Sequence, residues 1–166
     1  MKSLVVYFSR AGENSVNGNI EIIKKGYTEI LAQMIAKKTD SHIFKLEPVV
    51  PYPEKYDDCV ARAANEGFVE YLHPEFKIEE YDTIFIGFPN WWRTYPKIVG
   101  TFIKDNNWIS KTVIPFCTNE EGAFGLAEMQ LKNQIKGAIF KEGFVVKGAE
   151  LENQEEKIDS WLRRIL

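Results

Sequence analysis

The chain has 166 residues, a length typical of one domain, and its formal net charge of −3 is spread along the sequence. It has no basic stripe of the kind that binds nucleic acid, and its longest apolar runs, Leu4–Phe8 and Thr83–Phe88, are too short to span a bilayer. A signal-peptide pattern is also missing, so we expect a single-domain cytoplasmic protein that binds neither nucleic acid nor membrane.

Short apolar runs alternate with segments of helical periodicity along the chain. The runs that read as strands are Leu4–Phe8, His42–Leu46, Thr83–Phe88, Val113–Phe116 and Phe144–Val146. The segments that read as helices are Thr28–Lys38, Tyr56–Tyr71, one that begins near Pro96, one that follows Gly125, and Ile158–Ile165. This alternation predicts an α/β fold with a parallel sheet between two helical layers.

In such a sheet, ligands bind beyond the carboxyl ends of the strands, where the strand order reverses. The loops to consider therefore follow the first, third and fourth strands, and they begin at Ser9, Pro89 and Cys117. Cys117 and Cys59 lack the spacing of a metal site, and we expect both to be packing thiols.

The first loop contains hydroxyl and amide side chains at both of its ends. Ser9 and Asn14 follow the strand, Tyr27 and Thr28 stand at the start of the helix, and Ser15–Lys25 lies between them. Hydroxyls and backbone N–H groups at a helix N-terminus can hold a phosphate without a lysine, and we expect Thr28 to cap the helix. Helix capping alone is the alternative interpretation.

The second loop is unusual because two large rings stand where a polar loop is expected. Pro89 and Asn90 predict a turn, and Trp91 and Trp92 follow directly. Two indoles on a loop need a cover, and a flat heteroaromatic ligand would cover them by stacking. The alternative is that one tryptophan closes the core.

The third loop combines polar groups with glycines. Thr118 and Asn119 offer a hydroxyl and an amide, Gly122 and Gly125 allow close approach of the main chain, and Phe124 could form a second apolar wall. An ordinary connection between a strand and a helix is the alternative. Taken together, the three loops predict a site for a phosphate at one end and a flat ring at the other.

No grouping typical of hydrolytic enzymes accompanies these loops. His42 falls in a predicted strand and His73 stands beside a proline in a loop, so neither pairs with a serine or cysteine nucleophile. We expect the acidic pairs of the chain to form solvated faces. Hydrolytic chemistry at the predicted site therefore has little support.

Four stretches resemble the flavodoxin family, specifically its compact bacterial members. They are VVYFSRAGEN at the start, the PYP of Pro51–Pro53, YDTIFIGFPNWW of the third strand and TVIPFCTNEEGAFG of the fourth. The resemblance covers nearly the whole chain in the same order. It implies a three-layer α/β/α flavodoxin-like fold with a five-stranded parallel sheet in the order 2-1-3-4-5, and noncovalently bound FMN.

The resemblance also implies a role for each loop. The phosphate is expected at Ser9, Ala11, Asn14, Tyr27 and Thr28, and the ring between the Pro89–Trp92 and Cys117–Gly125 loops. Trp91 is the first candidate for contact with the ring, followed by Trp92. Arg10 either contacts the phosphate or points into solvent.

This chain departs from the family pattern at three positions. Ser15–Lys25 splits the phosphate loop and is expected to form a small hairpin near Gly18, so that Ser9 and Thr28 reach the same phosphate. Tyr27 replaces an asparagine, and Phe124 stands where many flavodoxins place a tyrosine.

The resemblance implies an electron carrier that works between a reductase and an acceptor protein. The alternative is an FMN-dependent NAD(P)H:quinone-type oxidoreductase. The sequence does not indicate an oligomeric state.

Overall fold

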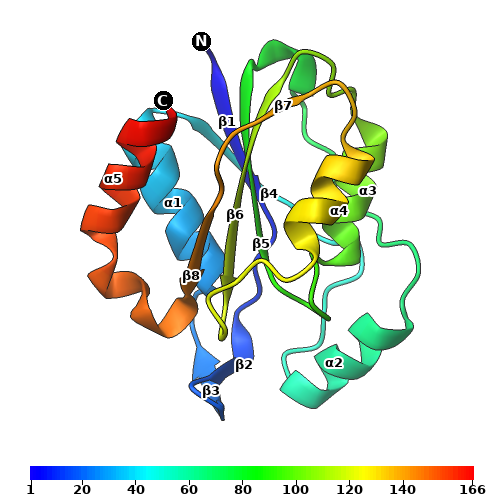
Figure 1. Ribbon diagram of the computed structural model, residues 1–166. Helices are drawn as coiled ribbons and strands as arrows, with labels where there is room; N and C mark the ends of the chain where they lie inside the picture. The colour runs from blue at the N-terminus through cyan, green and yellow to red at the C-terminus, as the bar shows by residue number, and fades with distance from the viewer.

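The computed structural model describes all 166 residues, and a parallel sheet forms its central layer (Figure 1). The strands are β1 (Ser3–Tyr7), β4 (His42–Lys45), β5 (Thr83–Pro89), β6 (Thr112–Asn119), β7 (Ile139–Phe140) and β8 (Phe144–Lys147). Their order is β4-β1-β5-β6-β7, and β8 pairs with the other half of β6. With β7 and β8 counted as one interrupted strand, this confirms the predicted order 2-1-3-4-5.

The fifth strand is interrupted because Pro115 lies in the middle of its neighbour β6. Val113 pairs with Phe140 and Phe116 with Phe144, so the two residues of β6 between these pairs face three residues of the interrupted strand. Proline has no N–H to donate and therefore leaves a gap in the ladder at this point.

Four helices cover the two faces of the sheet. In Figure 1, α1 (Tyr27–Thr39) and α5 (Glu155–Ile165) lie on one face, and α3 (Lys97–Asp105) and α4 (Ala127–Gln134) on the other. Each strand supplies alternate residues to the two faces, so Val5 and Tyr7 pack against α1 and α5, whereas Leu4 and Val6 pack on the opposite side. The three layers of the predicted fold are confirmed.

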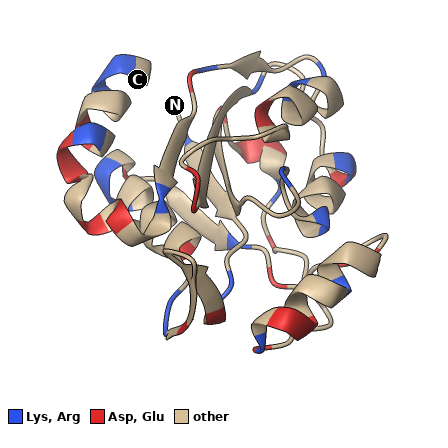
Figure 2. Cartoon of the chain, turned by 60° about the horizontal axis from the view of Figure 1, so that its bottom comes forward, with Lys and Arg blue, Asp and Glu red and all other residues tan.

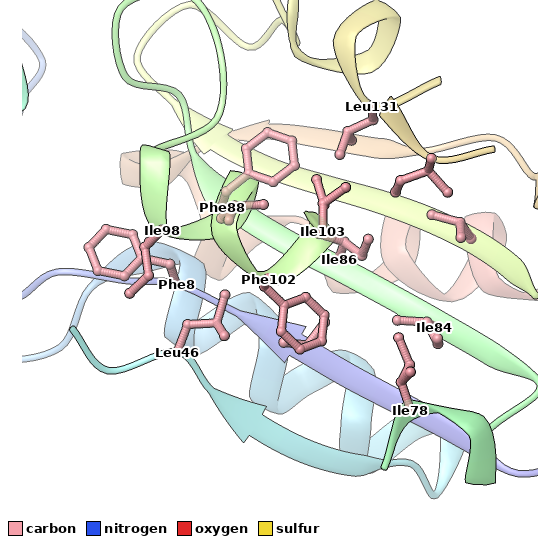
Figure 3. Packing of buried hydrophobic residues seen from close by; sticks show 14 of the residues in the cluster. Phe8, Leu46, Ile78, Ile84, Ile86, Phe88, Ile98, Phe102, Ile103 and Leu131 are labelled. Carbon is pink, nitrogen blue, oxygen red and sulfur yellow. The ribbon is translucent and has the colours of Figure 1, made fainter. Parts of the chain in front are cut away.

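The face under α3 and α4 is packed with large apolar side chains. Figure 3 shows Phe8, Ile86 and Phe88 of the strand side facing Ile98 and Phe102 of α3. All five are at most 2 % exposed. This packing holds the ends of β1 and β5, and therefore the loops that follow them, in fixed positions.

The second helix is shorter than predicted. It spans α2 (Tyr56–Asn65), and Glu66 has extended backbone angles (φ −75°, ψ 143°). The predicted end at Tyr71 is wrong because Gly67 follows and Tyr71 instead pairs with Pro48. Cys59 is the one buried residue of α2, and Figure 1 shows the helix beside the body of the molecule rather than on the sheet.

The segment between Ser9 and the first helix folds as an antiparallel hairpin. Its strands are β2 (Gly12–Val16) and β3 (Asn19–Ile23), and Asn17 and Gly18 form the turn with φ angles of 52° and 81°. Asn-Gly is a favoured pair for a two-residue hairpin turn because both residues tolerate positive φ. The small hairpin predicted near Gly18 is confirmed, and Figure 1 places it at the carboxyl edge of the sheet.

Charged residues of both signs are interspersed over the surface. Figure 2 shows Lys and Arg near Asp and Glu on the helices. None of the helices combines the length and the hydropathy that crossing a membrane requires.

Candidate functional site

A cleft of about 400 Å³ lies at the carboxyl edge of the sheet. The loops after β1, β5 and β6 all contribute to it, as the topology predicts. The predicted site residues that line it are Ser9, Arg10, Asn14, Tyr27, Thr28, Pro89, Asn90, Trp91, Trp92, Thr118, Asn119 and Gly125. The fold therefore brings most of the predicted residues together.

Four predicted residues do not line the cleft, namely Ala11, Cys117, Gly122 and Phe124. Ala11 is exposed beside it, and Gly122 (φ +70°) turns its loop by donating its N–H to Asn119 Oδ1. Cys117 points into the core, where burial raises the pKa of its thiol to about 12. Phe124 packs against Phe88, with ring centroids 6.5 Å apart, so the predicted second apolar wall is absent.

One end of the cleft is the N-terminus of α1. The predicted cap at Thr28 is wrong, because Gly26 is the N-cap and the helix begins at Tyr27. Ser9 takes over the capping role from the end of β1, since its Oγ accepts the N–H of Glu29 at 3.1 Å. A Cβ on Gly26 would lie 2.1 Å from that Oγ, so this contact requires glycine.

Thr28 is instead paired across the cleft floor. Its Oγ1 lies 2.7 Å from Oγ1 of Thr118, and the two residues are 1 % and 4 % exposed. Two hydroxyls carry two protons and one is used in their mutual bond, so one proton remains to donate. The hydroxyl proton of Ser9 is also free, because Ser9 Oγ is an acceptor in its bond to Glu29.

Two backbone donors add to these hydroxyls. The N–H groups of Tyr27 and Thr28 belong to the first turn of α1 and have no acceptor within the chain. Free N–H groups at the positive end of a helix favour an anion. Ser9 and Thr28 thus stand on either side of one group of donors, although 18 residues separate them in sequence.

Arg10 lines the cleft, and its guanidinium is bound within the chain. Its guanidinium donates to the carbonyls of Glu13, Pro53 (2.8 Å) and Glu54 (2.7 Å). Planar fork geometry suits several carbonyls at once. The interpretation that Arg10 points into solvent is therefore wrong, and the residue ties the hairpin to the loop before α2.

The two tryptophans occupy a tight turn. Trp91 and Thr94 exchange both backbone hydrogen bonds (2.8 and 3.1 Å), and Trp92 and Arg93 between them have φ angles of 52° and 67°. Each non-glycine residue whose backbone lies in this left-handed region lowers the free energy of unfolding by about 1 kcal/mol. The turn gives the two rings different exposure. Trp92 is 62 % exposed at the rim, whereas Trp91 is partly buried against the core.

The tryptophan loop and the loop after β6 form one wall. Asn90 donates its side-chain N–H to Phe124 O at 3.0 Å, and Leu126 N–H donates to Arg93 O at 2.8 Å. A Cβ on Gly125 would lie 2.6 Å from the same carbonyl of Arg93. The absence of a side chain at Gly125 therefore allows the two loops to come this close.

Several lining residues were not predicted. They are Ser15, Val16, Asn17, Tyr56, Arg93, Glu120, Glu121, Lys147, Gly148 and Ala149. Lys147 is the last residue of β8, which is a parallel strand. The rule that ligands bind beyond the carboxyl ends of parallel strands therefore also predicts the loop after Lys147. Ser15 could not be placed from sequence, since its bond to Glu120 Oε2 (2.7 Å) joins positions 105 residues apart.

Most residues that line the cleft are polar or charged. Neither histidine lines the cleft, because His42 bonds to Tyr81 and His73 lies against Tyr71 in a tilted ring contact beside a second hollow of about 580 Å³. No group of three potential metal ligands occurs in the chain. The arrangement can hold an anion at α1 and a flat ring near Trp91 and Trp92.

Solved structures of similar fold cover nearly the entire chain. A candidate flavoprotein from Bacteroides eggerthii has a TM-score of 0.75 at 24% identity, over 99% of this chain and 97% of that one. A second from Bacteroides uniformis has a TM-score of 0.71 at 26% identity, over 95% and 97%. A flavoprotein from Lactobacillus acidophilus in complex with FMN has a TM-score of 0.67 at 18% identity, over 97% and 98%.

Among curated proteins, none matches this chain. A protein-family model described as flavodoxin matches residues 2–165. The sheet order and the cleft at its carboxyl edge are those expected of this family. The match over residues 2–165 shows that the chain belongs to the flavodoxin family.

Proposed function

We propose that this protein binds FMN noncovalently in the cleft and carries electrons between a reductase and an acceptor protein. The observation that carries the proposal is the convergence of three strand-end loops on one cleft that has free donors at one end and two indoles near the other. The solved complex of a structural neighbour with FMN is consistent with it.

The residues at α1 fit the phosphate of FMN. The N–H groups of Tyr27 and Thr28, the hydroxyl of Ser9 and one proton of the Thr28–Thr118 pair would donate to its oxygens. Hydrogen bonds to a charged group are stronger than neutral ones, and the helix dipole adds to them. The guanidinium of Arg10 is bound to backbone carbonyls, so this fit rests on the hydroxyl and N–H donors.

The tryptophan loop fits the flavin ring. Trp91 lines the cleft and is held from behind by core rings, while Trp92 stands at the solvent rim. FMN, when bound, supplies the redox chemistry, and the protein supplies binding and orientation. Stacking on Trp91 would exclude water from one side of the ring.

The carrier role is the first candidate because Glu120 and Glu121 line the cleft, where they could form an acidic rim for contact with a partner protein. Fold alone does not distinguish the two roles. Anaerobic mixing of the FMN-loaded protein with NADPH, without a reductase, separates them. A carrier keeps its flavin oxidised over minutes, and dithionite then bleaches it. Bleaching within seconds of adding NADPH would contradict the carrier role and favour the oxidoreductase.

A further inference from the structure

The Pro51–Pro53 segment, between β4 and α2, brings a tyrosine to the back of the tryptophan loop. The Tyr52 ring lies 5.0 Å from the Trp91 ring, at 88° to it, and 5.6 Å from the Phe8 ring. Trp91 also meets Phe8 edge-on at 5.2 Å. Edge-to-face contacts are favourable and directional, so two rings determine how Trp91 is oriented.

Tyr52 itself is held on two sides by residues at the C-terminal end of α2. Its hydroxyl donates to Glu66 Oε1 at 2.7 Å, and the guanidinium of Arg62 lies 4.0 Å from its ring centroid. Arg62 is fixed in turn because it donates to the carbonyls of Val50 and Pro51. The Tyr52 ring therefore packs against Trp91, bonds to Glu66 through its hydroxyl and is covered on one face by Arg62.

The bond between Tyr52 and Glu66 matters because the carboxylate is poorly compensated. The Glu66 side chain is 9% exposed, its Oε2 has no hydrogen-bond partner, and Arg62 Nε lies 3.6 Å away. Burial raises the pKa of the Tyr52 phenol far above its ordinary value, so the phenol remains a donor at neutral pH. Loss of the bond would leave a buried carboxylate with a single long ion pair.

The rest of α2 does little to hold this arrangement in place. Cys59 is its one buried residue, and the helix lies beside the sheet rather than on it. The Tyr52 contacts therefore form the direct connection between the C-terminal end of α2 and the cleft wall.

We propose that Tyr52 is a positioning residue which, held by Glu66 and Arg62, fixes the ring of Trp91 for the flavin and so couples the end of α2 to occupancy of the cleft. This inference rests on the proposed FMN site. It assigns a role in cofactor binding to a segment that does not line the cleft.

Three single variants measure the coupling through the FMN dissociation constant. Tyr52→Phe keeps the ring and removes the hydroxyl, and we expect the constant to rise about fivefold. Glu66→Gln keeps an acceptor for Tyr52 and should stay within about twofold of the parent. Tyr95→Phe is the matched control, because Tyr95 is half-buried on Phe88 and its hydroxyl bonds to nothing.

Repeating Tyr52→Phe in a Trp91→Phe background tests whether the effect passes through Trp91. If Tyr52 acts by orienting that indole, its hydroxyl no longer affects FMN binding once the indole is gone. An equal rise of the dissociation constant in both backgrounds would overturn the proposal, because it would mean a general structural effect. Far-UV circular dichroism verifies that each variant is folded.

A measurement without flavin separates this inference from the proposed function. The near-UV circular dichroism of the apoprotein contains a contribution from Trp91, defined by its difference from Trp91→Phe. Tyr52→Phe should reduce that contribution by about half or more, and Tyr95→Phe should leave it unchanged. An unchanged Trp91 signal in Tyr52→Phe would refute the positioning role even if FMN binds. Failure of the parent protein to bind FMN would refute the proposed function and the coupling to cofactor binding, whereas the near-UV signal would still test how Tyr52 orients Trp91.

Discussion

The hydroxyl pair Thr28–Thr118 shows how single residues connect the fold to the site. Thr28 comes from the start of α1 and Thr118 from the end of β6, and their bond of 2.7 Å closes the cleft floor. Sequence alone identified both residues but gave them separate roles. Their pairing depends on strand order, because β6 reaches α1 only in the folded sheet.

Replacing Thr118 by valine tests this pair. The substitution keeps the shape but removes the partner of a hydroxyl that is 1 % exposed, so we expect a loss of about 1 kcal/mol in the free energy of unfolding and about fivefold weaker FMN binding. Thr101→Val is the matched control, because Thr101 is equally buried (4 %) but bonds within α3, to Lys97 O. Urea unfolding and flavin fluorescence titration measure the two effects. Equal FMN affinity in both variants would exclude Thr118 from the site.

At the scale of elements, Arg10 joins the hairpin to the loop before α2. Glu13 N–H donates to Glu54 O at 3.0 Å, and Glu13 Oε2 accepts the N–H of Tyr56 at 2.8 Å, so side chains and backbone of the hairpin side meet backbone groups of the loop. Three carbonyls share the guanidinium of Arg10. The hairpin is thus attached through its first strand.

We expect Arg10→Met to loosen this junction. The amides of Glu13 and Tyr56 should exchange hydrogen about tenfold faster, because the carbonyls that hold their surroundings lose charged donors. Arg164→Met is the control, since Arg164 forms an ion pair with Glu142 on the exposed surface far along the chain. Unchanged exchange at both amides in Arg10→Met would show that the hairpin is held by other contacts.

The elements were largely predictable because apolar periodicity reports burial. All five strands, the alternation with helices and the hairpin at Gly18 follow from local patterns. The end of α2 and the interruption of the fifth strand were not predicted. Gly67 and Pro115 are visible in the sequence, but their effects depend on which segments pair with Tyr71 and with β6. The same limit applies to the site, where Arg10, Phe124 and Ser15 have positions determined by tertiary contacts.

At the scale of the whole molecule, burial affects a set of weak acids in one direction. It raises the pKa of Cys117 from 9.0 to about 12 and that of Tyr71 from 10.0 to about 12, and it raises those of Cys59 and Tyr95 as well. Between about pH 9 and about pH 12, these groups stay protonated in the folded state but ionise in the unfolded chain. Their contribution to stability is therefore complete below about pH 9 and is lost as the pH rises towards 12.

We expect alkaline solution to destabilise the protein for this reason. Between about pH 7.5 and about pH 10.5, Cys117 alone should lower the free energy of unfolding by about 2 kcal/mol. Urea unfolding at both values, for the parent chain and for Cys117→Val, measures this term. The variant should lose correspondingly less stability over the interval. The same pH dependence in both proteins would show that Cys117 does not contribute.

The central claim is that the cleft holds FMN by its phosphate at the start of α1. Titration of the apoprotein with FMN and, separately, with riboflavin, which lacks the phosphate, tests it most directly. We predict that both flavins bind and that FMN binds at least about tenfold more tightly, because several hydrogen bonds to a charged group are lost with the phosphate. Equal affinity for the two flavins, or no binding of FMN, would contradict the account.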